Sequence, residues 1–412
     1  MNKNKTLWKK SKKIILKGNS LFSKNPENYA EDWPAYFEKA KGCQIWSIDG
    51  KKYTDFSYMG IGTNILGYSN SEIDSYVSKV INKGTMSTLN CVEEVSLAEK
   101  LIKMHNWSAM CKFTRTGAEA SAVAIRIGRI FSKKNKIAIC GYHGWHDWYL
   151  SVNLKEKKEL DTHLIKNLNV DGVDKNLRNS SVSFKHNDLD SFKKMVKRNN
   201  DIGVVIMEVE RFEEVDKKFL QYIRNYTKKK QITLIFDECT SGFRQTFGGL
   251  HLKYNINPDI CILGKALGNG YPINAVVGKK QVMSRAEKSF IGSTFWSDRV
   301  GSAAALKSLE IMEKEGSWVR LKKLGAFFKN RFKLILSKHN IEGDIIGNGS
   351  LLQFKLKNIS DEELKKYLAS EMLKHNILAS NVIYLSVAHN EKLLEKYFKH
   401  LDRILFKLSK KT

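Results

Sequence analysis

One stretch of the chain, residues 111–280, constrains the fold more than any other feature of the sequence. Within it, short apolar runs alternate with segments whose apolar residues recur at helical spacing. Strands that are apolar throughout are typical of a parallel sheet covered on both faces, and the helical segments supply the crossovers that such a sheet needs. We therefore expect a mostly parallel central sheet between layers of helices.

The expected elements follow from these runs. The strands are expected at Lys136–Cys140, Val204–Met207, Thr233–Phe236, Ile260–Leu263 and Asn274–Val277. Helices are expected at 92–105, Ala118–Phe131, Leu189–Arg198, Lys217–Lys228 and Ala303–Glu313. Near the start, Asp49-Gly50 separates two alternating runs, which is typical of a β-hairpin. The order predicts an N-terminal arm and small-domain segment at 1–85, a large domain at 86–310 and a C-terminal small domain at 311–412.

Composition narrows the class of protein. No apolar run in the 412 residues approaches the ~20 residues that cross a bilayer. The six cysteines are scattered without a C-x-x-C pair, which favours a reduced, cytoplasmic protein. The formal net charge of +27 is spread along a lysine-rich chain. Such a spread favours a general background over a nucleic-acid or membrane surface, so we expect neither partner.

Polar residues at the ends of the expected strands predict a ligand site, because ligands of parallel sheets collect at the carboxyl ends of the strands. The first group, Thr116, Gly117 and Ala118, opens an expected helix. Glycine lets the backbone approach a ligand, and the first N–H groups of a helix carry partial positive charge. This group is consistent with a phosphate site, but taken alone it is more typical of a plain helix cap.

The second group, Tyr142 and His143, follows the strand that ends at Cys140. A tyrosine ring in this place can stack on a flat aromatic cofactor. His143 and His146 could instead ligate a metal. The chain has no H-E-x-x-H pattern to complete such a site, so we expect no metal.

An acid and an amine complete the set. Asp237 follows a buried apolar strand, where a carboxylate is costly without a partner such as a cationic ring nitrogen. A helix cap or a magnesium ligand is the plainer interpretation of this residue. Lys265 ends another apolar strand, where desolvation makes an amine nucleophilic toward an aldehyde. A surface lysine is the alternative there. Along the sequence, these groups follow one another as a phosphate loop, a stacking aromatic residue, a carboxylate and a lysine.

These motifs carry a resemblance to a known family. The stretch from about 33 to 405 resembles the class III pyridoxal-phosphate aminotransferases, and within them glutamate-1-semialdehyde aminomutase and its relatives in surface-sugar biosynthesis. The segments that carry it are Thr116–Trp148, Ile232–Phe247 and Pro258–Pro272. The resemblance implies an α/β protein with the type I fold of pyridoxal-phosphate-dependent transferases. In this fold a large domain has a mostly parallel central sheet, and both termini form a small α/β domain.

The resemblance also implies roles for single residues around pyridoxal 5'-phosphate. Lys265 matches the catalytic lysine that forms the Schiff base, and Asp237 the partner of the pyridine nitrogen. Thr294 matches a residue that reaches the cofactor of a neighbouring subunit, which implies a homodimer. The other positions implied to bind the cofactor are Thr116, Gly117 and Ala118 at the phosphate, Tyr142 and Cys239 at the ring faces, and His143 and Glu208 near the ring.

Four departures from the family pattern bear on the substrate. Ala118 stands where serine or threonine is usual, Cys239 where valine is usual, and Val209 where proline is common. The aminomutases grip the substrate carboxylate with an N-terminal arginine, whereas Trp33–Glu38 holds none. The aromatic and polar groups of Phe295–Arg299 fit a bulkier, hydroxylated substrate.

We therefore expect an aminotransferase that moves an amino group between an amino acid and a keto or aldehyde substrate, a sugar intermediate of surface polysaccharide. Glutamate-1-semialdehyde 2,1-aminomutase of tetrapyrrole synthesis is the alternative. A nucleic-acid-binding protein on an inactive scaffold is disfavoured because Asp237 and Lys265 are both present. The sequence leaves open which arginine binds the donor carboxylate. The candidates are Arg115, Arg126, Arg211, Arg244 and Arg299.

Overall fold

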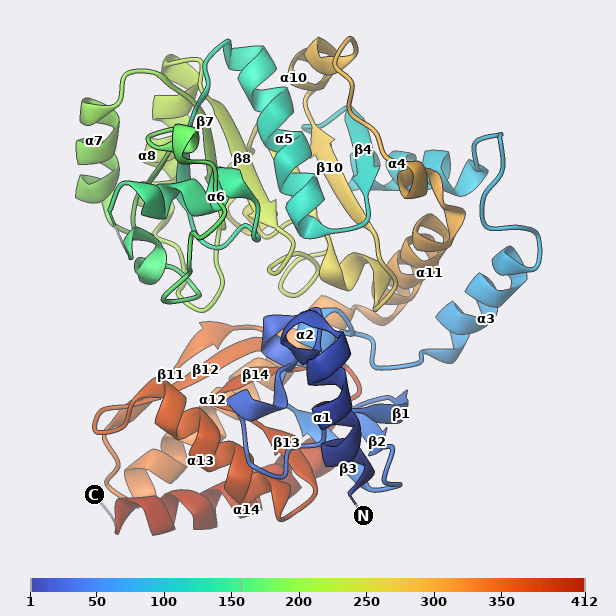
Figure 1. The fold of residues 1–412 in the computed structure, drawn as a ribbon, viewed down its shortest axis with the longest axis vertical. Coiled ribbons are helices and arrows are strands. Elements are labelled where there is room, and N and C mark those ends of the chain that lie inside the picture. Colours follow the sequence, from blue (N-terminus) through green and yellow to red (C-terminus); the bar gives the residue numbers. More distant parts are fainter. Residues whose placement is uncertain (1, 157, 411–412) are drawn as a thin grey trace. The chain divides into compact units, whose positions relative to one another are not determined.

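The computed structural model describes residues 2–156 and 158–410 (Figure 1). The chain forms two compact units, one running from Tyr76 to Glu310 and the other combining the chain up to Ser75 with the chain from Ile311 onward. The domain boundaries predicted after residues 85 and 310 stay predictions.

The large unit is built on a seven-stranded sheet with the order β4-β10-β9-β8-β7-β5-β6. Neighbouring strands from β6 to β9 pair in parallel, and β10 is antiparallel to both β9 and β4. The mostly parallel sheet expected from the sequence is therefore confirmed. The strands are β4 (Met110–Thr114), β5 (Lys136–Cys140), β6 (Ser181–Ser183), β7 (Ile202–Met207), β8 (Thr233–Glu238), β9 (Ile260–Leu263) and β10 (Asn274–Gly278).

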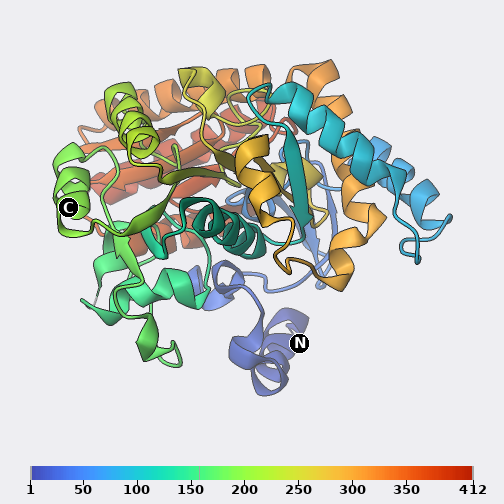
Figure 2. The ribbon, with the colours of Figure 1, turned by 90° about the horizontal axis from the view of Figure 1, so that it is seen from above.

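Helices cover both faces of this sheet, with α5 (Gly117–Ser132) on one face and α7 (Leu189–Arg198) and α8 (Lys217–Lys229) on the other (Figure 2). The side chains of β5 alternate between the two sides: Ile139 packs in the cluster under α5, and Ala138 in the cluster with α7 and α8. Because both faces are covered, every residue of β7, β8 and β9 is buried. This burial explains why the apolar stretches that form these strands do not alternate with polar residues.

The remaining helices of the large unit are shorter or lie at its edges. They are α4 (Val92–Met104), α6 (Asp147–Leu150), α9 (His251–Tyr254) and α10 (Lys280–Met283). Helices α3 (Ser71–Ile81) and α11 (Arg299–Glu315) contain the points where the chain passes between the units. Single 3₁₀ turns occur at Ser151–Leu154, Glu159–Thr162, Lys175–Leu177, Lys265–Gly268, Ser284–Ala286 and Thr294–Ser297.

The small unit contains two sheets, β1-β2-β3-β13 and β11-β12-β14. The predicted hairpin is present as β2 and β3, and Gly50 in its turn has a φ of +77°. Strand β13, from the C-terminal part of the chain, pairs in parallel with β3, so both termini build one unit as predicted. The strands are β1 (Phe37–Lys41), β2 (Gln44–Ser47), β3 (Lys52–Phe56), β11 (Gly343–Asn348), β12 (Leu351–Leu356), β13 (Ile377–Ala379) and β14 (Val382–Tyr384).

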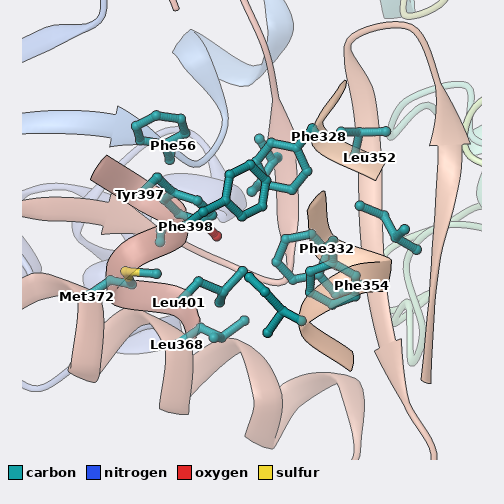
Figure 3. Close-up of a cluster of buried hydrophobic side chains, with 14 of the residues drawn as sticks. Phe56, Phe328, Phe332, Leu352, Phe354, Leu368, Met372, Tyr397, Phe398 and Leu401 are labelled. Carbon is teal, nitrogen blue, oxygen red and sulfur yellow. The ribbon is translucent and has the colours of Figure 1, made fainter. Parts of the chain in front are cut away.

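An aromatic core holds the small unit together (Figure 3). The rings of Phe332 and Phe354 stack at 4.2 Å, and those of Phe56 and Tyr397 at 4.5 Å. These rings come from β3, β12 and two long helices, so the core joins segments far apart in the chain. The helices are α1 (Lys3–Ile14), α2 (Met59–Gly62), α12 (Ser317–Lys338), α13 (Asp361–Leu373) and α14 (Glu391–Ser409), with 3₁₀ turns at Leu16–Gly18, Phe22–Lys24 and Pro26–Asn28.

The N-terminal segment, expected as a basic arm or surface helix, contains a helix that packs on the small unit. The Trp8 Nε1–H donates to Glu27 at 2.9 Å, and the Tyr36 hydroxyl donates to Ser11 at 2.7 Å. All six cysteines are free. Within the described residues, no helix has both the length and the apolar character needed to cross a membrane.

Candidate active site

Four strand ends of the large unit bring the predicted site residues to one edge of the sheet. Strands β5, β7, β8 and β9 run in parallel, so their carboxyl ends lie at the same edge. Tyr142 and His143 follow β5, Glu208 follows β7, Asp237 lies near the end of β8, and Lys265 follows β9. The long-range contacts below join these positions, although they are up to 123 residues apart in the sequence.

Lys265 is largely enclosed and has one hydroxyl partner. Its Nζ donates to the Thr240 Oγ1 at 2.7 Å. Burial lowers the pKa of the amine, and the nearby positive charge of Arg211 lowers it further. The backbone of Lys265 has a φ of +43°, a left-handed conformation that is strained for a residue with a Cβ. The structure thus combines a strained backbone at Lys265 with a desolvated amine whose pKa is lowered.

Asp237 is a buried carboxylate, 6% exposed, that faces His143. Its Oδ2 lies 2.8 Å from His143 Nδ1, and its Oδ1 accepts the Cys239 N–H at 3.1 Å. Burial raises the pKa of the carboxyl, but the hydrogen bond and charge of His143, the Cys239 N–H and the charge of Lys265 outweigh it, so the pKa lies below its usual value. The site therefore holds an ionised carboxylate.

The N-terminus of α5 offers unpaired backbone donors. Thr116 caps the helix: its hydroxyl accepts the Glu119 N–H at 3.3 Å, and the Glu119 carboxylate accepts the Thr116 N–H at 2.8 Å. Both polar groups of Thr116 are thus engaged in a capping box. In the described part of the chain, the N–H groups of Gly117 and Ala118 have no acceptor. These two N–H groups, at the positive end of a helix dipole, favour an anion.

Glycines allow close approach around this helix end. A Cβ on Gly117 would lie 3.3 Å from the Cys239 Sγ, and a Cβ on Gly264 only 1.9 Å from the Asn274 Oδ1. Gly144 has a φ of +106°, and a Cβ there would lie 2.9 Å from that of Ala118. Ala118 therefore packs directly against the loop after β5, which leaves little room for the larger side chain that is usual in the family.

A carboxylate and a guanidinium fix the loop that carries Tyr142. The Glu208 Oε2 accepts the Tyr142 N–H at 3.0 Å and the Arg211 Nε–H at 3.3 Å. Gly141 has a φ of +103°, and a Cβ there would lie 2.8 Å from Glu208 Oε2, so this position requires glycine. The Tyr142 ring stands edge-on to Tyr149 at 5.8 Å. Glu208 thus sets the backbone that directs the Tyr142 ring.

Thr294 is exposed and, within the described residues, forms no side-chain hydrogen bond with the other predicted site residues. Its segment is nevertheless anchored beside the start of α5. The Arg115 guanidinium donates to the carbonyl of Trp296 at 3.0 Å and contacts that of Asp298. The Trp296 Nε1–H donates to Glu119 at 3.1 Å. The segment of Thr294 is therefore fixed to the helix end that carries Gly117 and Ala118.

The structure gives the five candidate arginines different surroundings. Arg211 is the one whose charge lowers the pKa of Lys265, after the effect of burial. The other four have partners of different kinds: carbonyls of Trp296 and Asp298 for Arg115, of Phe290 for Arg126 and of Thr240 for Arg244, and the carboxylate of Glu93 for Arg299.

Three residues of the site were missed by the sequence interpretation. Thr240, the partner of Lys265, carries no sequence signal because its position follows from the turn after β8. Asn274 begins the antiparallel strand β10, and its side chain lies 3.5 Å from Cys239 Sγ. Glu119 could have been found, because T-x-x-E before an apolar helix is the sequence pattern of a capping box.

Glu238, the neighbour of Asp237, serves a different network. Its buried carboxylate accepts the backbone N–H of His251 at 3.0 Å and the ring Nδ1–H at 2.7 Å. Glu238, His251 and Cys261 form the one group of three or more potential metal ligands among the described residues, and neither His143 nor His146 belongs to it. Hydrogen bonds already use the Glu238 and His251 atoms of that group, which favours a structural role.

The groups at this sheet edge fit the parts of pyridoxal 5'-phosphate. The N–H groups of Gly117 and Ala118 suit its phosphate, and the glycine cradle leaves space for the approach. The ionised Asp237 suits a cationic ring nitrogen, and the desolvated Lys265 suits an aldehyde.

Comparisons with known proteins agree with this geometry. The sequence model of the family described as Aminotransferase class-III matches residues 27–396. The chain is 32% identical to the glutamate-1-semialdehyde 2,1-aminomutase of Nitrosopumilus maritimus, over 95% of this chain and 96% of that one. It is 24% identical to the 2'-deamino-2'-hydroxyneamine transaminase of Streptomyces kanamyceticus, again over 95% and 96%.

The fold is shared with solved structures. A transaminase with PLP bound superposes with a TM-score of 0.88 at 21% identity, over 99% of this chain and 98% of that chain. With the family match spanning most of the sequence and this agreement in fold, the chain belongs to the class III aminotransferases, enzymes that use pyridoxal 5'-phosphate.

Proposed function

We propose that the chain is an aminotransferase that moves an amino group from an amino acid to a keto or aldehyde group of a sugar intermediate of surface polysaccharide, with Lys265 as the catalytic residue. The observation that carries the proposal is the desolvated Lys265 amine at the same sheet edge as the ionised Asp237. The two unpaired N–H groups at the start of α5 complete this arrangement.

Each residue has a distinct task in this proposal. When bound, the cofactor supplies an aldehyde that captures amines and a ring that accepts electrons. Lys265 Nζ holds the cofactor and takes up and returns the proton of the substrate α-carbon, while the Thr240 hydroxyl orients that nitrogen. Asp237 holds the ring nitrogen in its protonated state. Gly117 and Ala118 bind the phosphate through their N–H groups.

The remaining predicted residues shape the cofactor pocket in this proposal. Tyr142 and Cys239 border the two faces of the ring. The proximity of its Sγ to the glycine cradle supports the role of Cys239: a Cβ added at Gly117 or Gly264 would lie 3.3 or 3.2 Å from this atom. Glu208 acts near the ring by holding the Tyr142 backbone.

The substrate assignment rests on two features of the sequence and one relative. Trp33–Glu38 offers no arginine for a small amino-aldehyde acid, and Phe295–Arg299 adds aromatic and polar groups. A relative named for a hydroxylated compound, 2'-deamino-2'-hydroxyneamine, aligns along nearly the whole chain. The alternative is the aminomutase, favoured by the higher identity to the Nitrosopumilus maritimus enzyme.

Complementation distinguishes the two reactions. A strain that cannot make 5-aminolevulinate is rescued by an aminomutase and not by a sugar aminotransferase. We expect no rescue by the soluble, cofactor-loaded protein. We expect instead that a keto-sugar from a panel of keto-sugars and aldehydes restores the absorption band after glutamate has changed it. Rescue, or no response to any member of the panel, contradicts the sugar assignment.

We further propose a cytoplasmic homodimer in which Thr294 reaches the cofactor of the neighbouring subunit. Thr294 is exposed, and large apolar side chains of the large unit are exposed as well, such as Phe290 at 90% and Phe295 at 68%. Light scattering should give a dimer mass. Thr294→Val should weaken cofactor binding without changing that mass, whereas a fully active monomer contradicts the proposal.

The first test of the function is the visible absorption spectrum of the purified protein. The wild type should show a yellow band on loading with pyridoxal 5'-phosphate, and glutamate should move this band to shorter wavelength. Lys265→Ala should lack the yellow band and should not turn over. A wild type without a band contradicts the cofactor site, and a band that glutamate leaves unchanged contradicts glutamate as donor.

A further inference from the structure

A cavity of about 470 Å³ lies on the small unit, between the first half of α12 and the start of α14. All the residues that line it belong to the C-terminal part of the chain, and none of them is a candidate active-site residue. Pockets that bind small organic molecules measure about 300–1,000 Å³. The cavity therefore has the size of a ligand site within a single unit.

One wall of this cavity is a single face of α12. Its residues follow one another at intervals of three and four positions, so their side chains lie on the same side of the helix. They are Arg320, Lys323, Leu324 and Phe327. The two cationic side chains are exposed, whereas the two apolar ones pack against the aromatic core of the small unit. The wall thus combines cationic groups with an apolar floor formed by Leu324 and Phe327.

The opposite wall is the start of α14, where Asn390, Glu391 and Lys392 line the cavity. The Asn390 side chain caps the helix, because its oxygen accepts the Leu393 N–H at 2.9 Å. Lys392 adds a third cation to those of α12. Glu391 is the one acidic residue in the described lining, so the side chains around the cavity carry three positive charges and one negative charge.

The remaining lining residue, His389, adds no charge to this sum. Its ring is buried, and both ring nitrogens are engaged: Nδ1 accepts the Ser386 N–H at 3.0 Å, and Nε2 lies 2.8 Å from the Asp55 carbonyl oxygen. Burial lowers the pKa of this imidazole to about 4, so the ring is neutral at physiological pH. The charge of the cavity therefore comes from the exposed side chains of its two walls.

The cations of the cavity have no acidic partner. Among the residues that the structure describes, Arg320, Lys323 and Lys392 form no ion pair with a carboxylate. A neighbouring groove of about 220 Å³ between the same two helices shows the opposite arrangement. There Arg331 and Lys338 each pair with an acidic residue of α14, at 2.7 Å and 2.8 Å. The cavity thus keeps an excess of positive charge that an anionic ligand would neutralise.

We propose that this cavity is a binding site for an organic diphosphate of the nucleoside diphosphate type. The Arg320 guanidinium can bind phosphate oxygens through two parallel hydrogen bonds, and the ammonium groups of Lys323 and Lys392 match the remaining charge of two adjacent phosphates. The apolar floor of Leu324 and Phe327 contacts the organic part of the ligand. An inorganic anion would use the cations alone and leave this floor without a partner.

Calorimetric titration of the full chain, saturated with pyridoxal 5'-phosphate, tests the class of ligand. The probes are adenosine diphosphate, inorganic pyrophosphate and adenosine. We expect one adenosine diphosphate to bind per chain, pyrophosphate to bind about tenfold more weakly because it cannot contact the apolar floor, and adenosine to give no heat. Absence of binding by adenosine diphosphate overturns the proposal. Equal affinity for pyrophosphate overturns the assignment to an organic diphosphate.

Matched charge reversals locate the site. Arg320→Glu should raise the dissociation constant for adenosine diphosphate at least tenfold, and Lys392→Glu on the opposite wall should do the same. The control is Lys322→Glu, which makes the same charge change at an exposed residue of α12 that does not line the cavity. At physiological salt it should change the constant by about twofold at most. Equal effects of Arg320→Glu and Lys322→Glu would show binding to the general positive charge of the chain and would overturn the proposal. Because Lys392→Glu alters the other wall, it decides the result if Arg320→Glu fails to fold.

Discussion

At the scale of single residues, the ionisation of the site depends on which hydrogen-bond partners each titratable group has. Lys265 Nζ has a hydroxyl for a partner rather than a carboxylate, so its pKa stays lowered by burial. Asp237 has two donors and stays ionised. An amine beside a carboxylate in direct contact would form an ion pair and lose its nucleophilicity. The spacing between these two residues therefore matters as much as their identity.

Thr240→Val tests the hydroxyl that orients Lys265. Valine keeps the shape of threonine and removes the acceptor 2.7 Å from Nζ. We expect kcat to fall by about tenfold with KM nearly unchanged, since about 1.4 kcal/mol of orienting hydrogen bond is lost. Steady-state kinetics with the accepted substrate pair measures it.

Thr246→Val is the matched control for this variant. Thr246 lies in the same loop and donates to the Gly249 carbonyl at 3.0 Å, so its loss removes a hydrogen bond of similar strength without touching Lys265. Its kcat should match the wild type. Equal effects of the two substitutions would show that Thr240 acts only through loop stability.

At the scale of elements, the first turn of α5 joins stability to ligand binding. Glu119 accepts the N–H groups of Arg115 and Thr116 and the Nε1–H of Trp296. The next two N–H groups remain for a ligand. One carboxylate thus fixes the helix start, the strand end before it and the segment that carries Thr294.

Glu119→Ala should lower both stability and cofactor affinity. Loss of the capping box should cost about 1 kcal/mol of unfolding free energy. The dissociation constant for pyridoxal 5'-phosphate should rise several-fold, because the turn that presents Gly117 and Ala118 is no longer fixed. Thermal denaturation of the cofactor-free protein and absorbance titration with the cofactor measure the two effects.

The chain offers its own control in the small unit. Ser360 and Glu363 form the same capping box at the start of α13. Glu363→Ala should cost a similar free energy of unfolding and leave the cofactor affinity unchanged. A loss of affinity in both variants would mean that global stability, rather than the α5 turn, controls binding.

At the scale of the whole molecule, each unit has a buried histidine in its packed interior. The Nδ1–H of His105 in the large unit donates to the Leu101 carbonyl at 2.9 Å, and its Nε2 accepts the Gly249 N–H at 3.0 Å. His389 of the small unit lies 2.8 Å from the Asp55 carbonyl and accepts the Ser386 N–H at 3.0 Å. Burial lowers the pKa of each ring to about 4.

These histidines predict the pH dependence of stability. Their folded-state pKa is below the unfolded value of about 6.5, so the unfolded chain binds their protons first. Their contribution is fully present above about pH 6.5 and is lost as the pH falls toward 4, by roughly 3 kcal/mol for each ring. Urea denaturation between pH 7 and pH 4 should show this fall.

His389→Gln should flatten the pH dependence. Glutamine can keep a donor and an acceptor but does not titrate, so the variant should be less stable at pH 7 and lose less stability on acidification. A pH profile with the same slope as the wild type would show that other groups, such as carboxylates, control acid unfolding.

The sequence by itself determined the sheet, the order of the site motifs and the family. Strands buried on both faces must be apolar throughout, so β5, β7, β8 and β9 were visible as runs. Strands β4 and β6 escaped detection, because β4 has an exposed Lys112 at its centre and β6 is only three residues long. The sequence pattern identifies a strand when the residues of that strand are uniformly buried.

Only the tertiary structure decided which polar atoms meet. Thr240 reaches Lys265 from a turn 25 residues away, and the charge of Arg211, one of five candidate arginines, lowers the pKa of that amine. The two oxygens that contact His143 come from different strands. The physical reason is the same in each case: a residue type states what hydrogen bonds a side chain can make, and the packing of distant strands decides which partner is within 3 Å.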